Sequence, residues 1–396
     1  MPSINITYLD RDIQQDVWFP VKYKGKIYYI GYQPTSPVDG NSCVVIDVKN
    51  KTANYIDVGD PDASGPRCRL IEYTLKETKV IFRVVYGLSG VAKIRCSEIE
   101  IDLETMTGTR TTLWEYEDAD FYIPPDLSKG QVLSRKFLLL AIPNKPYLWY
   151  IDARNGTLID KWNTGFGEFN PRVSGKAIAR GDGLKVLIGL HLAGGNHYVL
   201  DVYGKSVTEI TNSDVGTDSP DPLILNPLYT RSKLLFPSSS CHVVDQLAKI
   251  VWFDEDFNLL GKTDTSVIYS SCKTHGGTLL GITGGDTIAM IAQLTNNHTN
   301  YATEWSIRYL EIDPSTWNIV TNTVLYVSND SNNRPFYFNQ SRQYSDKLSL
   351  AIVDREKRKV YMTSRWMVAG NKRGALVEID ISDISMREWN MFNYLI

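Results

Sequence analysis

The feature that most constrains the fold is a pattern of strands and turns that recurs seven times along the 396 residues. Its first marker is an aspartate that ends an alternating apolar run just before a polar turn, as in YLWYIDARNGTLIDKW at 147–162. Successive markers lie 49 to 67 residues apart, about 55 on average. The marker aspartates are Asp47, Asp102, Asp152, Asp201, Asp254, Asp313 and Asp380.

A second marker precedes each aspartate by about 16–26 residues. It is a short turn, usually ending in lysine, that starts a strongly apolar strand, as in KETKVIFRVVY at 76–86 and SRKFLLLAI at 134–142. Two markers that recur in one order predict a repeat array in which each repeat holds four strands, A to D. Helical periodicity is nearly absent. A four-stranded unit near 50 residues, repeated seven times, is typical of a β-propeller.

The sequence therefore predicts an all-β, single-domain protein over 1–396: a seven-bladed β-propeller of four-stranded antiparallel blades. Residues 3–9 are predicted to form an extra strand that pairs with the last blade and helps close the ring. The C-terminal MREWNMFNYLI is predicted to supply a final strand of that blade. The predicted blades span approximately 15–60, 66–117, 130–163, 172–212, 222–264, 272–328 and 346–396.

This repeat layout resembles that of the WD-repeat and YVTN-like superfamily of seven-bladed propellers. The resemblance covers about 15–396 and concerns layout only, because the Gly-His and Trp-Asp dipeptides of WD repeats do not recur. It therefore implies a fold and no functional residue.

The marker aspartates have a structural interpretation. An aspartate at the end of strand C can accept hydrogen bonds from backbone N–H groups of the following turn. We expect that role rather than seven carboxylates facing one catalytic centre. The turn lysines are expected to be solvated hairpin tips.

Composition and charge exclude several classes of protein. With 43% hydrophobic and 22% charged residues the chain is globular, and a net charge of −3 favours no nucleic-acid partner. We predict no membrane span and no signal peptide, hence a cytoplasmic or virion-associated protein. The five cysteines lack metal or redox spacing, so we expect reduced, mostly buried thiols.

Binding residues are expected on one face of the propeller. The A–B and C–D turns are short, whereas the B–C and D–A connections are long and irregular, as functional loops on a rigid scaffold are. The longest connection, 326–346, combines several aromatic and basic residues. Aromatic rings in such loops offer a large contact area with a polar edge. The candidate binding residues are Tyr301, Trp305, Arg334, Phe336, Tyr337, Arg342, Trp366, His197 and His242.

No motif predicts a catalytic, cofactor or metal site. The histidines lie near the long-loop face but lack paired metal-ligand spacing. The glycine-rich GITGGD (281–286) and LAGGNH (192–197) do not lead into a helix, so they do not predict a phosphate cradle. The acidic segment 57–64, with Asp57, Asp60 and Asp62, is interpreted as a solvated turn, with a loosely held surface cation as the alternative.

Three classes of function remain open. A non-catalytic binding or assembly scaffold, including a subunit of a virion or another large assembly, presents its long loops to a protein or glycan. A propeller-type lyase, lactonase or glycosidase would place its site at the mouth of the central channel. A carbohydrate-binding module is the third class.

Overall fold

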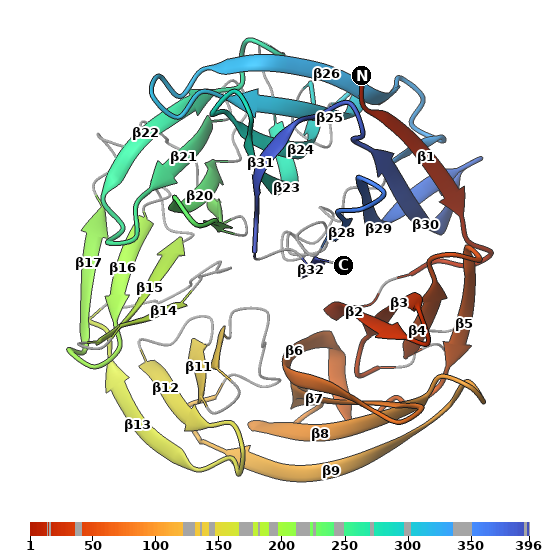
Figure 1. The fold of residues 1–396 in the computed structure, drawn as a ribbon. Coiled ribbons are helices and arrows are strands. Elements are labelled where there is room, and N and C mark those ends of the chain that lie inside the picture. The colour runs from red at the N-terminus through yellow and green to blue at the C-terminus, as the bar shows by residue number, and fades with distance from the viewer. Residues whose placement is uncertain are drawn as a thin grey trace. The chain divides into compact units, whose positions relative to one another are not determined.

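The computed structural model describes residues 1–13, 15, 17–35, 42–121, 131–134, 137–141, 147–165, 177–180, 183–189, 197–210, 222–224, 227–240, 249–269, 273–296, 302–335, 351–391 and 394–395. Within these ranges all regular structure is β-strand, and the strands form seven sheets (Figure 1). None of the described residues belongs to a helix with the length and apolar character of a membrane span.

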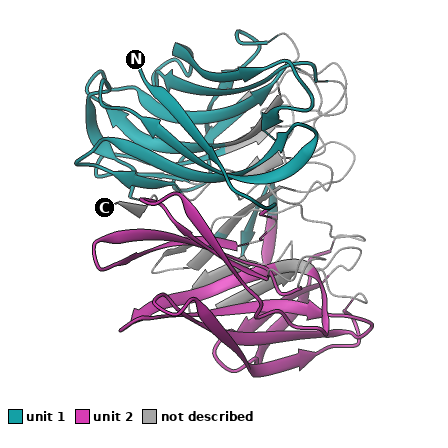
Figure 2. Ribbon diagram, turned by 90° about the vertical axis from the view of Figure 1, so that its right-hand side faces the viewer, with its two compact units in different colours: residues 1–12, 174–201, 208–396 teal, residues 13–173, 202–207 magenta. Residues whose placement is uncertain are grey.

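The chain divides into two compact units, which Figure 2 colours separately. Unit 2 comprises residues 13–173 and 202–207. It holds three sheets, each ordered as in the sequence. They are β2 (Val17–Tyr23), β3 (Lys26–Tyr32), β4 (Cys43–Asp47), β5 (Thr52–Ile56); β6 (Ala63–Lys76), β7 (Lys79–Leu88), β8 (Lys93–Asp102), β9 (Thr107–Glu117); and β10 (Gln131–Ser134), β11 (Phe137–Ala141), β12 (Tyr147–Asp152), β13 (Leu158–Asn163).

Unit 1 comprises residues 1–12, 174–201 and 208–396. Its first sheet contains β14 (Ala177–Arg180), β15 (Gly183–Gly189), β16 (His197–Asp201) and β17 (Ser206–Ile210). The first two residues of β17 are grouped with unit 2. The second sheet contains β18 (Pro222–Ile224), β19 (Leu228–Tyr229), β20 (Leu234–Ser240), β21 (Lys249–Phe253) and β22 (Leu259–Asp264).

Two further sheets of unit 1 include the ends of the chain. One contains β23 (Lys273–Thr283), β24 (Ile288–Thr295), β25 (Trp305–Ile312), β26 (Ile319–Ser328) and β31 (Met386–Trp389). The other, the last sheet, contains β1 (Ser3–Tyr8), β27 (Arg334–Pro335), β28 (Ile352–Asp354), β29 (Lys359–Val368), β30 (Asn371–Asp380) and β32 (Tyr394–Leu395).

Successive antiparallel strands joined by short turns build these sheets, as the two sequence markers predict. In the first sheet, for example, β3 pairs with β4 so that Tyr28 lies opposite Asp47, and β4 pairs with β5 so that Asp47 lies opposite Thr52. Serial four-stranded antiparallel sheets are the blades of a β-propeller. The prediction of an all-β propeller is confirmed.

The structural role of the marker aspartates is also confirmed, and Asp152 illustrates it. Its Oδ1 accepts a hydrogen bond from the backbone N–H of Arg154, 2.9 Å away, in the turn after β12. Asp47, Asp102, Asp254, Asp313 and Asp380 accept equivalent bonds from the turns that follow them. Asp201 ends β16 in the same position. These carboxylates hold turns in place.

Neighbouring sheets within a unit pack through repeated contacts of their outer strands. In unit 2, Trp114 of β9 donates its indole N–H to the carbonyl of Ala153, in the turn of the next sheet. In unit 1, a Cβ atom added at Gly261 of β22 would lie 2.0 Å from the ring of Trp317, in the turn of the next sheet. Only a glycine allows this approach, and Trp317 also stacks on Trp252. In both units, therefore, a tryptophan contact joins the outer strand of one sheet to a turn of the next sheet.

Both chain ends reach the last sheet, but part of the C-terminal segment joins the sheet before it. β1 pairs antiparallel with β30, so residues 3–8 form the outer strand of the last sheet, as predicted. The prediction that MREWNMFNYLI supplies a final strand of that sheet is wrong for β31 and holds only for β32, at the end of the segment. β31 instead pairs with β23 of the preceding sheet, and β32 pairs in parallel with β28. Because β1 already occupies the outer edge of β30, the C-terminal segment pairs with the free edges of β23 and β28.

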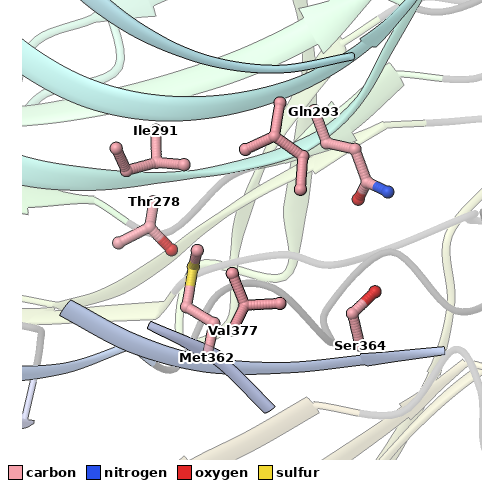
Figure 3. A pocket seen from close by; sticks show the side chains of 7 residues that line it. Thr278, Ile291, Gln293, Met362, Ser364 and Val377 are labelled. Carbon is pink, nitrogen blue, oxygen red and sulfur yellow. The ribbon is translucent and has the colours of Figure 1, made fainter. Parts of the chain in front are cut away.

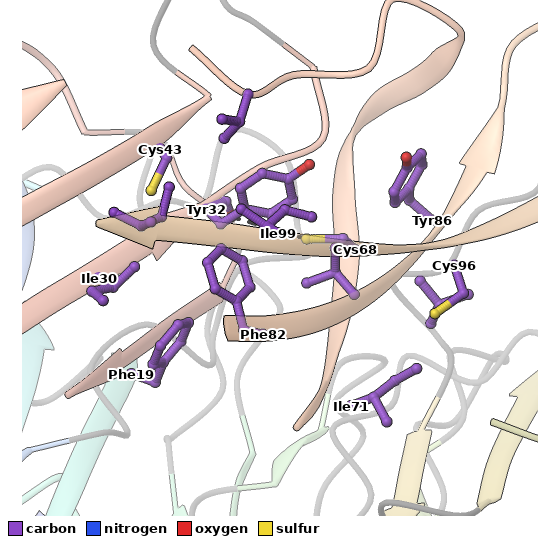
Figure 4. Close-up of a cluster of buried hydrophobic side chains, with 14 of the residues drawn as sticks. Phe19, Ile30, Tyr32, Cys43, Cys68, Ile71, Phe82, Tyr86, Cys96 and Ile99 are labelled. Atoms are coloured by element: carbon purple, nitrogen blue, oxygen red, sulfur yellow. Dashed lines mark hydrogen bonds between the residues drawn. The ribbon is translucent and has the colours of Figure 1, made fainter. Parts of the chain in front are cut away.

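The largest hydrophobic cluster among the described residues lies in unit 2 and contains three cysteines (Figure 4). Cys43 and Cys96 are buried free thiols, and the buried thiol of Cys68 lies 3.9 Å from the carbonyl oxygen of Tyr32, as expected for core cysteines. Burial raises the pKa of Cys43 and Cys96, so these thiols stay protonated and unreactive at neutral pH. Cys241 and Cys272 lie outside the described residues.

Candidate functional site

Three of the nine candidate binding residues come together in unit 1. Arg334 begins β27, and its guanidinium carbon lies 4.2 Å from the centre of the Trp305 ring at the start of β25. β27 pairs with β29 so that Pro335 lies opposite Trp366. Residues that lie about 30 to 60 positions apart in the sequence thus belong to one local site.

The tryptophans form the base of this site. Trp366 is fully buried and Trp305 is 3% exposed. The ring of Trp366 packs edge-to-face against Tyr326 at 5.2 Å and Tyr8 at 6.0 Å between ring centres. Tyr8 is 43% exposed, and Tyr326 and Arg334 are half-buried, so these three side chains face outward over the buried indoles. We call Tyr8, Trp305, Tyr326, Arg334 and Trp366 the aromatic platform.

Hydrogen bonds fix the connection that carries Arg334. The backbone N–H of Ala369 donates to Oδ1 of Asn333 at 2.9 Å, and the N–H of Gly370 donates to the carbonyl of Asn332 at 3.1 Å. Nε of Arg334 donates to the carbonyl of Ser331 at 3.0 Å. Residues 328–335 are therefore tied to the β29–β30 hairpin, and the platform is ordered before any ligand binds.

Basic side chains lie on the hairpin beside the platform. Arg373 lies opposite Trp366 and Lys372 lies opposite Met367 in the β29–β30 pairing, and both are exposed. Arg365, on the same hairpin, is buried and donates from Nε to Asp12 at 2.6 Å. The exposed rim of the hairpin thus carries positive charge beside aromatic rings.

The other candidate residues cannot be placed at this site. Tyr301, Phe336, Tyr337, Arg342 and His242 lie outside the described residues. His197 begins β16 and pairs with Gly189, with its side chain outside what the structure describes.

A second cluster, in unit 2, was not anticipated from the sequence. Asp60 follows β5 and its side chain is fully buried. Its Oδ2 accepts from the hydroxyl of Tyr86 at 2.6 Å and from the guanidinium groups of Arg95 at 2.7 Å and Arg110 at 3.0 Å. Burial alone would raise the pKa of Asp60, but the bonds from Tyr86 and Arg95 outweigh it and hold that pKa below its usual value.

The expectation of a solvated turn at 57–64 is therefore wrong for Asp60. The three groups that bind its carboxylate come from β7, β8 and β9, so Asp60 joins its own sheet to the next one. A carboxylate neutralised by two guanidinium groups stays ionised and supports no proton transfer at neutral pH. No group of three or more His, Cys, Asp or Glu side chains that could hold a metal ion occurs in the described part of the chain.

Asp118 repeats this arrangement at the next connection. It follows β9 and accepts from the indole N–H of Trp149 at 2.9 Å, from Nζ of Lys161 at 3.0 Å and from the hydroxyl of Tyr116 at 3.0 Å. The pKa of Asp118 is lowered because the hydrogen bonds that it accepts outweigh the effect of its burial. The Lys161 ammonium also lies 4.9 Å from the centre of the Tyr147 ring. Asp60 and Asp118 therefore act as latches between consecutive sheets.

In unit 1, other side chains join one sheet to the next. Tyr269, which follows β22, bonds to Ser306 at 3.0 Å and accepts from Arg308 of β25 at 2.9 Å. Arg308 also lies over the Tyr269 ring, 4.9 Å from its centre. The position after an outer strand, rather than the residue type, is what these latches share.

One internal cavity lies between the last two sheets of unit 1, in the region that Figure 3 shows. Thr278, Gln293 and Ser364 provide its polar lining, and Ile291 and Met362 part of its apolar lining. Its volume of about 10 Å³ corresponds to about one water molecule. It is too small to be a substrate site.

Comparisons with known proteins give similarity in fold at low identity. No family model matches the chain, and no curated protein does. Among solved structures, BamB from Moraxella catarrhalis is 13% identical with a TM-score of 0.35, and covers 95% of this chain and 100% of its own. The β-propeller domain of Myceliophteria thermophila Cps50 (Swd1) is 8% identical with a TM-score of 0.42, over 94% and 99%. Hsv2 from Kluyvelomyces marxianus is 9% identical with a TM-score of 0.41, over 90% and 93%.

Proposed function

We propose that this chain is a non-catalytic binding scaffold that holds a protein partner on the aromatic platform. The observation that carries the proposal is the meeting of Trp305, Arg334 and Trp366, three residues chosen from the sequence as binding candidates. Tyrosine, tryptophan and arginine are the residues that most often dominate protein–protein binding energy. Prior ordering of 328–335 lowers the entropy that a partner must offset on binding.

The burial of the tryptophans favours a protein over a sugar. A carbohydrate site usually offers an open aromatic face, but Trp366 is fully buried and Trp305 is 3% exposed. The outward groups are instead two tyrosines and a guanidinium, with Lys372 and Arg373 beside them. This surface suits a polypeptide segment that combines acidic and apolar side chains.

Selection from a random peptide library displayed on phage tests the proposal. We expect selected peptides to be acidic, and Arg334→Ala to weaken their binding about tenfold. Arg334→Lys keeps the charge but loses the planar stacking on Trp305, so its binding should be intermediate. The matched control is Arg154→Ala, which removes an exposed arginine bonded to Asp152 within its own turn and should bind as the wild type does.

The competing functions give different results. Selected peptides that bind Arg334→Ala and wild type equally would contradict the platform. Hits on a glycan array that Arg334→Ala abolishes would identify a carbohydrate-binding module instead. Stoichiometric calcium, manganese or zinc in the purified protein would favour the enzyme class over the scaffold.

A further inference from the structure

The C-terminal segment crosses three sheets of unit 1 and is held by backbone hydrogen bonds and by side-chain contacts. β31 extends the β23–β26 sheet beyond β23, with Trp389 opposite Gly281 and Glu388 opposite Ile282. The N–H of Met391 then donates to the carbonyl of Tyr229 in the sheet before, at 2.7 Å. β32 finally pairs with β28 of the last sheet. We call residues 385–391 the strap.

Side chains help to fix the position of the strap. Oε2 of Glu388 accepts from the backbone N–H of Ser232 at 3.0 Å, and Arg387 pairs with Asp286, but Asn390 makes the most bonds. Asn390 is fully buried, and its Nδ2 donates to the carbonyls of Pro227 at 3.0 Å and Leu279 at 2.9 Å. Its Oδ1 accepts from the N–H of Tyr229 at 2.9 Å. A carboxamide both donates and accepts, so no other side chain of this size could satisfy all three backbone groups.

The strand edge that receives the strap is shaped for it. Gly281 has φ +149°, and a Cβ atom added there would lie 2.0 Å from the carbonyl oxygen of Glu388. The N–H of Gly284 donates to the carbonyl of Ser385 at 2.7 Å. The glycine-rich segment 281–286 thus has a role that the sequence alone did not indicate: it makes room for a close backbone approach. We call Pro227–Tyr229 with 279–284 the notch.

Met386 and Trp389 of the strap pack against the core of the last two sheets, but the strap buries less of its side chains than the strands beneath it do. Asn390 is its one buried residue, Trp389 and Met386 are half-buried, and Met391 is 47% exposed. Every residue of β24, by contrast, is buried. A segment with few buried apolar contacts opens at a lower free energy than the sheet beneath it.

We propose that the notch is a sequence-specific peptide-binding groove, filled in cis by the strap and able to accept the same segment from a second copy of this chain. Recognition is by strand addition at the edge of β23, with the asparagine as its specificity determinant. In the intact chain the tethered strap has an effective concentration in the millimolar range, so it excludes a free competitor. This inference does not depend on the proposed function of the platform.

A labelled peptide of sequence SMREWNMFNYLI, matching residues 385–396, tests the proposal on full-length chains. Asn390→Ala should release the strap, and we expect this variant to bind the peptide at least tenfold more tightly than the wild type does. The same peptide with alanine in place of its first asparagine should not bind. Asn371→Ala, at the exposed start of β30, is the matched control and should behave as the wild type.

A second variant separates the notch from the strap. Gly281→Ala places a methyl group where the Glu388 carbonyl lies, so it should release the strap and also refuse the peptide. Peptide binding to Gly281→Ala as tight as to Asn390→Ala would overturn the proposed groove.

Hydrogen exchange tests the proposal on the wild-type chain, so its result does not depend on whether a variant folds. The amides of Asn390 and Met391 should exchange at a lower free energy of opening than those of β24 and β25. If strap and β24 amides exchange only together, the strap is an integral part of the sheet and the proposal fails.

Discussion

At the scale of single residues, two kinds of aspartate serve this fold in different ways. The markers, such as Asp152, bind the turn that follows them in the chain. Asp60 and Asp118 bind side chains that belong to the next sheet. The first kind stabilises a hairpin, whereas the second joins sheets.

Replacing Asp60 with asparagine tests its role as a latch. The change leaves Arg95 and Arg110 without the buried carboxylate that they share, so the free energy of unfolding should fall by about 3 kcal/mol. The matched control is Asp62→Asn, since Asp62 also contacts Arg95, at 3.1 Å, but its side chain is 65% exposed. That variant should lose under about 1 kcal/mol.

Urea unfolding followed by tryptophan fluorescence measures both changes. Equal destabilisation by the two variants would mean that Asp60 is no more than a surface ion pair.

The markers could be predicted from the sequence because their partners lie two or three residues away. Asp60 could not, since Tyr86, Arg95 and Arg110 approach it only when the chain folds. Its segment, DVGDPDAS, has the composition of an ordinary solvated turn. The platform lies between these cases: residue type suggested Trp305, Arg334 and Trp366, but only the β27–β29 pairing brings them together.

At the scale of elements, alternating hydrophobicity located the strands but did not determine which edge each one joins. β1 and β31 are both short, with no repeat marker of their own. The outer edge of β30 takes β1, whose Ile4 and Ile6 pack on the core of the last sheet. β31 is then directed to β23, where Gly281 allows close approach. Pairing depends on such long-range fit, which sequence periodicity does not encode.

The contribution of β1 can be tested with two neighbouring substitutions. Ile6→Asp places a carboxylate against the hydrophobic cluster of unit 1, and we expect a loss of about 2–3 kcal/mol in its free energy of unfolding. Asn5→Asp adds the same charge on the exposed side of the strand and should change stability by under about 0.5 kcal/mol.

Hydrogen exchange of β30 is the local measurement for this pair. Amides of 375–380 should lose protection in Ile6→Asp, because their pairing with β1 weakens. Unchanged protection there would show that the last sheet does not require its N-terminal strand.

At the scale of the whole molecule, the latches predict where acid first weakens the protein. The pKa values of Asp60 and Asp118 are lowered in the folded state, so both carboxylates contribute stability above the unfolded value of about 3.9. That contribution is lost as the pH falls through the folded pKa values. Both residues belong to unit 2, whereas the counterpart in unit 1 centres on the hydroxyl of Tyr269, which bonds to Arg308 and to a single carboxylate, Glu304.

We therefore expect pepsin, which cleaves in acid, to cut β6–β13 of unit 2 before β23–β26 of unit 1 as the pH falls from 4 to 2. The double variant Asp60→Asn and Asp118→Asn should be less stable than the wild type at pH 7. Its stability should fall less than that of the wild type on acidification, because both titrating latches have been removed. Urea midpoints at pH 7 and pH 3 measure that difference. First cuts in unit 1, or a double variant with the wild-type pH dependence, would show that acid acts elsewhere than at the joints between sheets.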